Sequence, residues 1–185
     1  MKITAPTIHT ERLTLSPFVS EDADDVAALA GALEVAATTV NIPHPYEPHM
    51  AREWFASHDP LLELGTGLHL KITRKADGAL IGGLGFAGIS TAHSHAELGY
   101  WIAVPYWKMG YATEAARALM VYGFETLGLH RIHAHHFANN PGSGRVLTKI
   151  GMLPEGVWRH HVRKWDAFHD VEAYGILSTD PLPPI

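Results

Sequence analysis

One segment, residues 95–137, restricts the possible folds more than any other part of the chain. Residues 95–104 have the pattern of a strand, and the apolar residues of positions 111–127 recur at the spacing of one helix face. Gly128 ends that helix, and residues 130–137 return to a strand pattern. A strand, a helix and a strand in this order predict a crossover connection, with the helix packed on a sheet.

Further strands are expected on either side of this segment. Residues 68–74 alternate, residues 76–78 have turn chemistry, and residues 79–89 form a glycine-rich apolar run, which together indicate an antiparallel hairpin. Residues 13–18 are expected to open the sheet, and residues 155–163 and 171–177 to complete it. Early hairpins combined with a later crossover predict an α/β (α+β) fold, in which a mixed sheet carries helices on both faces.

Helical patterns lie between the predicted strands. Ser20 precedes two acids and then apolar residues at helical spacing as far as Leu33, so Ser20 is expected to cap a first helix. Residues 41–48 contain three prolines and are expected to be a loop. A second helix is expected over residues 49–62, and a short one over residues 143–150.

Composition narrows the classes of function. A length of 185 residues predicts one domain, residues 1–185, and the formal net charge of -5 argues against nucleic acid or an anionic membrane surface as a partner. The sequence has no cysteine, which excludes disulfides, thiolate metal sites and a cysteine nucleophile. Neither a secretory signal nor an apolar run of membrane-spanning length is found, so the expected location is the cytoplasm.

The turn before the long helix has the features of an anion site. Gly110 and Ala112 are small and let a ligand approach the backbone closely. The first turn of a helix presents amide groups without internal partners and a partial positive charge. The pattern therefore favours a bound phosphate or diphosphate; the alternative is an ordinary turn from strand to helix.

Several motifs, in one order along nearly the whole chain, resemble those of the GNAT superfamily and, within it, the RimJ/RimL-like ribosomal-protein N-acetyltransferase branch. In chain order they are Glu97-Leu98-Gly99-Tyr100-Trp101-Ile102, Tyr106-Trp107-x-x-Gly110-Tyr111-Ala112-Thr113-Glu114-Ala115, Leu127-Gly128-Leu129-His130-Arg131-Ile132, Asn140-x-x-Ser143 and Val146-Leu147-x-Lys149-x-Gly151-Met152. Supporting matches are Glu11-Arg12-Leu13-x-Leu15 and the loop Ile42-Pro43-x-Pro45-Tyr46. Lys108 and Met109 stand where Gly-Lys is more usual in this branch, a departure that affects the fine geometry of the turn.

The resemblance implies a GNAT-type, mostly antiparallel sheet and acetyl-CoA as the acyl donor, with no metal. It implies that backbone amides bind the diphosphate of coenzyme A, at Met109, Gly110, Tyr111, Ala112 and Thr113. It also implies that the pantetheine arm pairs with the backbone of Ile102, Ala103 and Val104 and contacts Asn140.

Direct acetyl transfer needs a neutral amine, a polarised thioester carbonyl and a proton for the departing thiolate. Glu97 is the single carboxylate of its strand and is the candidate base, directly or through a water; the alternative is a solvated residue or the partner of a cation. By the resemblance, Ser143 is the candidate acid; the alternative is a helix N-cap. No covalent enzyme intermediate is expected.

Two other signals carry less weight. Residues 83–88 match the glycine pattern of dinucleotide-binding turns, but no helix pattern follows them. His133 and His135 share one strand face, with His136 adjacent, yet a third zinc ligand is not visible, so packed or solvated histidines are the expectation.

The acceptor is the least constrained feature. By family position His44, Tyr46 and Trp54 would line its pocket; the alternative is that they pack the loop and helix. A protein α-amine, with a pKa of about 7.7–8.0, tolerates a weaker base than a lysine side chain near about 10.4. Small amines (an aminoacyl nucleotide, a polyamine or an antibiotic) are alternatives, as are an acyl-CoA-binding module without turnover and a structural interaction domain. The oligomeric state stays open, with a homodimer as one alternative.

Overall fold

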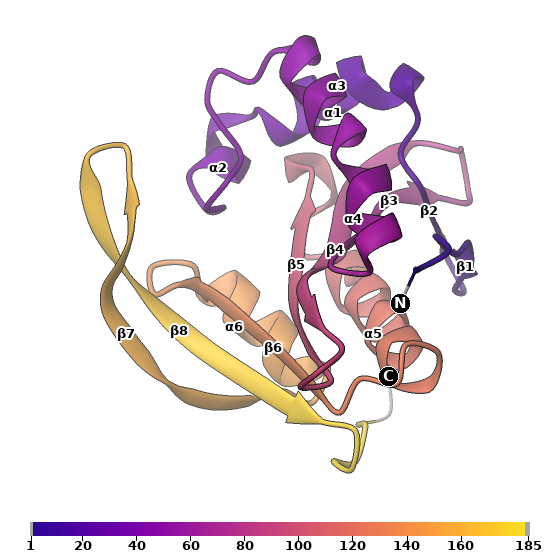
Figure 1. Cartoon of the computed structure of the whole chain (residues 1–185). Coiled ribbons are helices and arrows are strands. Elements are labelled where there is room, and N and C mark those ends of the chain that lie inside the picture. Colours follow the sequence, from indigo (N-terminus) through magenta and orange to yellow (C-terminus); the bar gives the residue numbers. More distant parts are fainter. Residues whose placement is uncertain (1, 184–185) are drawn as a thin grey trace.

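The computed structural model describes residues 2–183, which contain one sheet of eight strands. The strands are β1 (Ile8–His9), β2 (Leu13–Ser16), β3 (Leu68–Arg74), β4 (Leu80–Ser90), β5 (His95–Ile102), β6 (Arg131–Phe137), β7 (Leu153–Lys164) and β8 (Ala167–Leu177). Their order across the sheet is β1-β2-β3-β4-β5-β6-β8-β7, with β5 and β6 parallel and the other neighbours antiparallel (Figure 1). The predicted mixed, mostly antiparallel sheet is confirmed.

Helices cover both faces of the sheet (Figure 1). On one side lie the short 3-10 helix η1 (Ser20–Asp22) and the helices α1 (Ala23–Ala30), α2 (Leu33–Ala36), α3 (Pro48–Ala56) and α4 (His58–Leu64), and on the other lie α5 (Tyr111–Glu125) and α6 (Pro141–Lys149). Helices α1 and α3 pack on Trp101, while α5 buries Leu119 and Met120 against the core of the sheet. Within residues 2–183, no helix combines the length and the apolar character that crossing a bilayer requires.

The prediction of one helix over residues 49–62 is wrong, because the chain breaks there into α3 and α4 at Ser57. Pro60 explains the break: it has no amide to donate to the carbonyl of Ala56, and its ring would clash with that carbonyl in a continuous helix. The Ser57 hydroxyl instead donates to the Trp54 carbonyl at 2.6 Å.

Two predicted helix starts are also corrected. Ser20 is the first residue of η1 and not a cap; the Asp22 carboxylate accepts from the Val19 amide at 2.7 Å. Helix α6 begins at Pro141, two residues before Ser143, because proline fits the first position of a helix. Asn140 is its N-cap, with the side-chain oxygen 3.3 Å from the Ser143 amide nitrogen. The alternative of Ser143 as N-cap is therefore wrong.

Strand β5 ends at Ile102, two residues earlier than predicted. The carbonyl of Ala103 accepts from the amide of Tyr106 at 2.9 Å, which starts the short 3-10 helix η2 (Val104–Tyr106). Pro105 lies inside this turn and has no amide with which to extend a strand ladder.

Strands β7 and β8 form a long ribbon that extends beyond the sheet and bends toward α2 (Figure 1). Its tip is held by Lys164, a residue that is only 8% exposed. The Lys164 ammonium donates to the carbonyls of Thr39, Val40 (3.3 Å) and Ile42 (2.8 Å), in the loop after α2. Burial lowers the pKa of Lys164, because it disfavours the charged ammonium. The three carbonyl acceptors offset the free-energy cost of burying that charge.

Replacing Lys164 by Met is expected to release the ribbon tip from this loop. A hydrogen bond to a charged group contributes about 1.5–3 kcal/mol, so we expect the free energy of unfolding to fall by about 2 kcal/mol. Amide hydrogen exchange should speed up at residues 39–42. The matched control is Arg163→Met, since Arg163 is exposed and pairs with Asp166 alone in the described chain. Equal exchange in the two variants would contradict the docking role of Lys164.

Candidate active site

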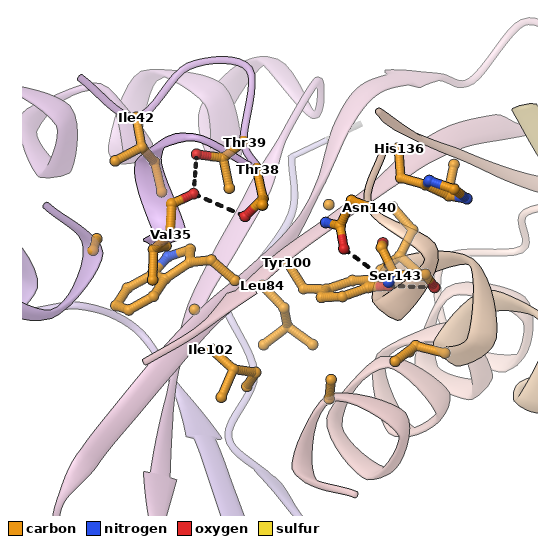
Figure 2. A pocket seen from close by; sticks show the side chains of 18 of the residues that line it. Val35, Thr38, Thr39, Ile42, Leu84, Tyr100, Ile102, His136, Asn140 and Ser143 are labelled. Carbon is orange, nitrogen blue, oxygen red and sulfur yellow. Dashed lines mark hydrogen bonds between the residues drawn. The ribbon is translucent and has the colours of Figure 1, made fainter. Parts of the chain in front are cut away.

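A cavity of about 1000 Å³ lies between the two helical layers and crosses the sheet beside β5, where β5 and β6 diverge. Figure 2 shows its two ends: Val35, Thr38, Thr39 and Ile42 stand on one side of the central strands, and His136, Asn140 and Ser143 on the other. We call the part lined by α1, α2, α3 and the loop after α2 the α3 half. The part lined by the start of α5 and by α6 is the α6 half.

The start of α5 presents free amide groups to the α6 half. Gly110 is the N-cap, with φ +83°, a backbone conformation that favours glycine. The first amide to donate within the helix is that of Glu114, which reaches the Gly110 carbonyl at 3.1 Å. The amides of Tyr111, Ala112 and Thr113 donate to no acceptor in residues 2–183, and these residues, with Gly110, line the cavity. The predicted anion site is therefore open at this helix start.

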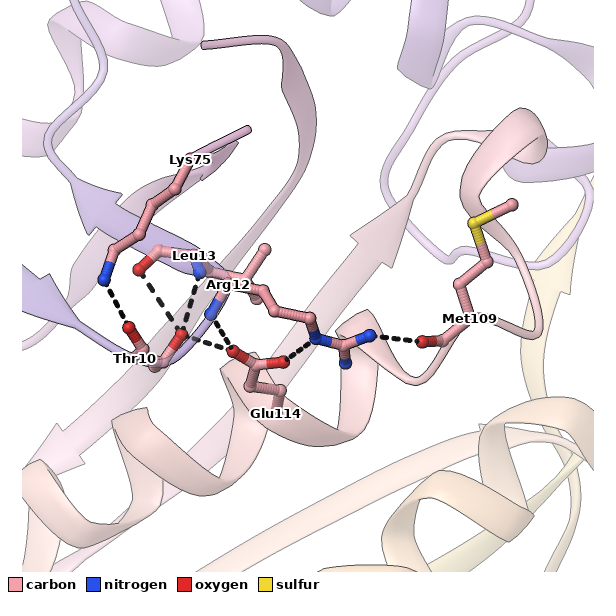
Figure 3. Close-up of polar contacts among 6 residues, drawn as sticks. All are labelled: Thr10, Arg12, Leu13, Lys75, Met109 and Glu114. Carbon is pink, nitrogen blue, oxygen red and sulfur yellow. Dashed lines mark hydrogen bonds and ion pairs between the residues drawn. The ribbon is translucent and has the colours of Figure 1, made fainter. Parts of the chain in front are cut away.

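The fifth predicted residue of this turn, Met109, lies outside the cavity lining and is half exposed. Its carbonyl accepts from the Arg12 guanidinium at 3.0 Å, so Met109 anchors the turn to the strand β2 region instead (Figure 3).

Arg12 also neutralises the acid in the first turn of α5 (Figure 3). The Glu114 carboxylate accepts from the Arg12 side chain at 2.7 Å, from the Arg12 amide at 2.8 Å and from the Thr10 hydroxyl at 2.6 Å. Burial opposes ionisation, but these hydrogen bonds outweigh it and lower the pKa of Glu114. With its charge compensated, Glu114 does not repel an anion at the helix start.

Three cations border the α6 half, and none of them was predicted from the sequence to bind a ligand. Lys108 precedes the turn, and Arg145 and Lys149 lie four residues apart on α6, which places them on one helix face. None of the three forms an ion pair within the described chain. The sequence signal that could have identified Arg145 and Lys149 is their position shortly after the Asn140-x-x-Ser143 motif, four residues apart.

Strand β5 pairs with β6 only at its first three residues, and beyond Glu97 the two strands diverge. In an antiparallel pair of strands, every second residue directs its main-chain groups toward the partner strand. The Ala103 amide donates to the Ile81 carbonyl at 2.9 Å, so Ala103 faces β4. Tyr100 and Ile102 therefore direct their main-chain groups away from β4 and into the gap between β5 and β6. The Ile102 carbonyl there accepts from the Trp107 indole at 2.6 Å.

The pairing groups that β5 leaves free at this gap include the amide and carbonyl of Tyr100 and the amide of Ile102. Of the three residues predicted to pair with a pantetheine arm, the structure places Ile102 at the gap. Ala103 uses both main-chain groups within the protein, and Val104 belongs to η2.

Glu97 lies on β5 at the end of its pairing with β6 and lines the cavity. His135 Nδ1 lies 3.1 Å from Glu97 Oε1, and His133 Nε2 lies 4.0 Å from Oε2. The hydrogen bond from His135 lowers the pKa of Glu97 despite its partial burial. Glu97 is thus an ionised carboxylate beside an imidazole at neutral pH, and His135, also at the cavity wall, was not predicted as part of this pair.

Ser143 and Asn140 both line the α6 half. The Ser143 hydroxyl lies 2.7 Å from the hydroxyl of Tyr100, a partner that the sequence interpretation missed (Figure 2). Burial raises the pKa of Tyr100, so its hydroxyl stays protonated at neutral pH. Ser143 thereby belongs to a pair of hydroxyl groups that faces the divergence of β5 and β6.

Two of the three predicted acceptor residues, Tyr46 and Trp54, line the α3 half. His44 does not: its Nδ1 lies 2.8 Å from the carbonyl of Gly31, outside the cavity lining. Residues 83–88 lie inside β4 and lead into no helix. Across residues 2–183, no group of three or more potential ligands is arranged to hold a metal ion.

Comparisons with known proteins place this geometry among acetyltransferases. Residues 12–153 match the family model described as Acetyltransferase (GNAT) domain. The chain is 31% identical over 173 residues to the uncharacterised N-acetyltransferase YoaA of Bacillus subtilis (strain 168), covering 94% of this chain and 97% of that one. It is 30% identical over 95 residues to the ribosomal-protein-serine acetyltransferase of Escherichia coli (strain K12), covering 51% and 53%. A solved GNAT-family acetyltransferase from Bacillus anthracis superposes with a TM-score of 0.83 at 25% identity, over 95% of this chain and 100% of that one.

Proposed function

Because this chain belongs to the GNAT acetyltransferase family, and is an acetyl-CoA-dependent N-acetyltransferase, we propose that its acceptor is the α-amine of a protein or peptide. One observation carries the proposal: a single cavity joins free helix amides and three cations at one end to an ionised carboxylate, Glu97, at the other. The match to an enzyme named for ribosomal-protein serine supports the choice of a protein amine.

The residues of the α6 half fit acetyl-CoA. Its phosphates would be held by the free amides of Tyr111, Ala112 and Thr113 and by nearby cations, because a helix start and basic side chains together favour anions. The main-chain groups of Tyr100 and Ile102 would pair with the amides of the pantetheine arm. Once bound, acetyl-CoA supplies the activated thioester carbonyl.

Glu97 is the proposed proton acceptor for the amine. Its lowered pKa keeps it ionised, which lets it attract the ammonium form and then receive a proton directly or through a water. His135 holds one carboxylate oxygen at 3.1 Å and so fixes its orientation. A carboxylate is a weak base, which suits an α-amine with a pKa of about 7.7–8.0 better than a lysine side chain.

Ser143 is the proposed acid on the opposite side of the strand. Its hydroxyl shares a hydrogen bond with Tyr100, and this pair can donate a proton where a thiolate departs. Asn140 positions Ser143 by capping α6. Orientation of both reactants in one cavity would supply much of the rate enhancement.

The proposal is tested by measuring free-thiol release from acetyl-CoA with purified protein. The acceptors are peptides with free amino termini, the same peptides with blocked termini and an internal lysine, and small amines. We expect release with free amino termini and little with blocked ones. Faster release with small amines would favour a small-molecule enzyme, and acetyl-CoA binding without release for any amine would favour a non-catalytic module.

A further inference from the structure

The two halves of the cavity differ in charge. The α6 half is bordered by Lys108, Arg145 and Lys149. The lining that comes from α1, α2, α3, the loop after α2, β3 and β4 contains no lysine, arginine, aspartate or glutamate, and Glu97 on β5 is the carboxylate that faces it. Burial lowers the pKa of His69, so this lining histidine is neutral at pH 7.

The remaining lining of the α3 half is mostly apolar. Its larger side chains come from three helices, the following loop and β5: Val26, Val35, Ile42, Tyr46, Met50, Trp54 and Trp101. The hydroxyls of Thr38 and Thr39 already donate to carbonyls of α2, at 3.0–3.3 Å (Figure 2). The α3 half therefore offers hydrophobic surface and one negative charge.

Gly99 leaves space directly beside that charge. It lies between Glu97 and Trp101 on the same face of β5, because side chains alternate along a strand. A Cβ atom at Gly99 would meet nothing within 4 Å. Two glycines of the adjacent strand β4 leave no such space. A Cβ at Gly83 would lie 2.7 Å from the Trp101 ring, and one at Gly85 would lie 2.3 Å from the Leu68 carbonyl oxygen.

On the basis of the proposed acetyl transfer, we infer that the acceptor is a monoamine with an apolar group next to its amine, and that Gly99 provides the room for this group. In a peptide, that group is a hydrophobic first side chain such as Leu or Phe. A second ammonium, as in a polyamine, would find no further carboxylate among the described lining residues. A nucleotide phosphate would find no lysine or arginine among the lining residues of the α3 half, and an unpaired charge in an apolar site is costly. The nearby Lys164 ammonium is outside the lining and already donates to the carbonyls of the loop after α2.

The test compares peptides that differ only in the first residue (Ser, Ala, Leu or Phe), together with spermidine and an aminoacyl adenylate analogue. We expect kcat/KM for Leu or Phe to exceed that for Ser by about tenfold or more, since each buried methylene contributes severalfold. A preference for Ser, spermidine or the adenylate would overturn the inference while leaving acetyl transfer in place. Absence of thiol release with every amine, despite acetyl-CoA binding, would overturn the proposed function itself.

The variants Gly99→Ala and Gly99→Leu test the residue. Gly99→Leu fills the space and should lower kcat/KM for the Phe peptide by about tenfold or more, and Gly99→Ala should lower it less. In both variants, kcat/KM for the Ser peptide should fall less than kcat/KM for the Phe peptide. The dissociation constant for acetyl-CoA, measured by calorimetry, should not change, which also shows that each variant is folded. An equal loss for the Ser and Phe peptides, or no loss for either, would overturn the assignment of Gly99.

Discussion

Replacing Glu97 by Gln is expected to lower kcat by about a hundredfold to ten-thousandfold, the range that a positioned general base contributes. Gln keeps the shape of the side chain but removes both the charge and the ability to take a proton. Acetyl-CoA should bind unchanged, because the phosphate-binding groups lie in the α6 half. The measurements are steady-state thiol release with a peptide amine and calorimetric titration with acetyl-CoA.

The matched control for this variant is Glu155→Gln. Glu155 is a half-exposed strand carboxylate that pairs with Arg131 at 2.7 Å and lies outside the cavity lining. Its replacement should leave kcat close to wild type. A Glu97→Gln enzyme with wild-type kcat would show that the amine loses its proton elsewhere.

The pH dependence of kcat/KM gives a second measurement on Glu97. The hydrogen bond from His135 holds the Glu97 pKa below its ordinary value of 4.5, so the carboxylate is ionised throughout the neutral range. The rate should then rise with pH up to the pKa of the amine, at about 7.7–8.0 for a peptide α-amine, and should show no loss of the base until the pH falls below the ordinary carboxyl range. The variant His135→Leu removes the donor, so the acid limb of the profile, where Glu97 becomes protonated, should move toward higher pH. An unmoved limb would exclude His135 as the cause.

The sequence predicted those parts of the fold and site that depend on local patterns. Hydrophobic periodicity and the glycines at the element ends predicted a strand before Gly110, a long helix after it and a second strand over residues 130–137. The structure confirms them as β5, α5 and β6, with β5 and β6 parallel. The free amides at the helix start also follow locally, since any helix leaves its first donors unpaired. The break between α3 and α4 was also a local signal, because Pro60 interrupts the helical pattern, but the prediction gave the pattern more weight than the proline.

The partners of the predicted catalytic residues could not be derived in the same way. His135 reaches Glu97 because the register pairs Glu97 with His133, and Tyr100 reaches Ser143 because α6 packs beside the diverging strand. Each pairing depends on a register or a docking that many residues set together. The same holds for Lys164, whose three carbonyl partners lie more than 100 residues earlier, with sequence separations of 122 to 125.

The double variant Arg145→Gln, Lys149→Gln is expected to raise the dissociation constant for acetyl-CoA by about 10- to 30-fold. Both residues are exposed and four positions apart on α6, so each is expected to contribute up to about 1 kcal/mol toward the phosphates, and about 1.4 kcal/mol corresponds to tenfold in affinity. Exposed charges are screened by salt, so the wild-type dissociation constant should rise with added NaCl more steeply than that of the variant. Calorimetric titrations at two salt concentrations measure both effects.

The matched control is Arg159→Gln, Arg163→Gln, which removes the same charge from the exposed β7–β8 ribbon. If the cations of α6 act by direct contact with phosphate, this control should bind acetyl-CoA like the wild type at either salt concentration. If both double variants lose affinity equally, the net charge of the protein and not the cavity border attracts the anion. In that case the amides of Tyr111, Ala112 and Thr113 would be left as the local phosphate site, because their hydrogen bonds do not depend on either pair of side chains.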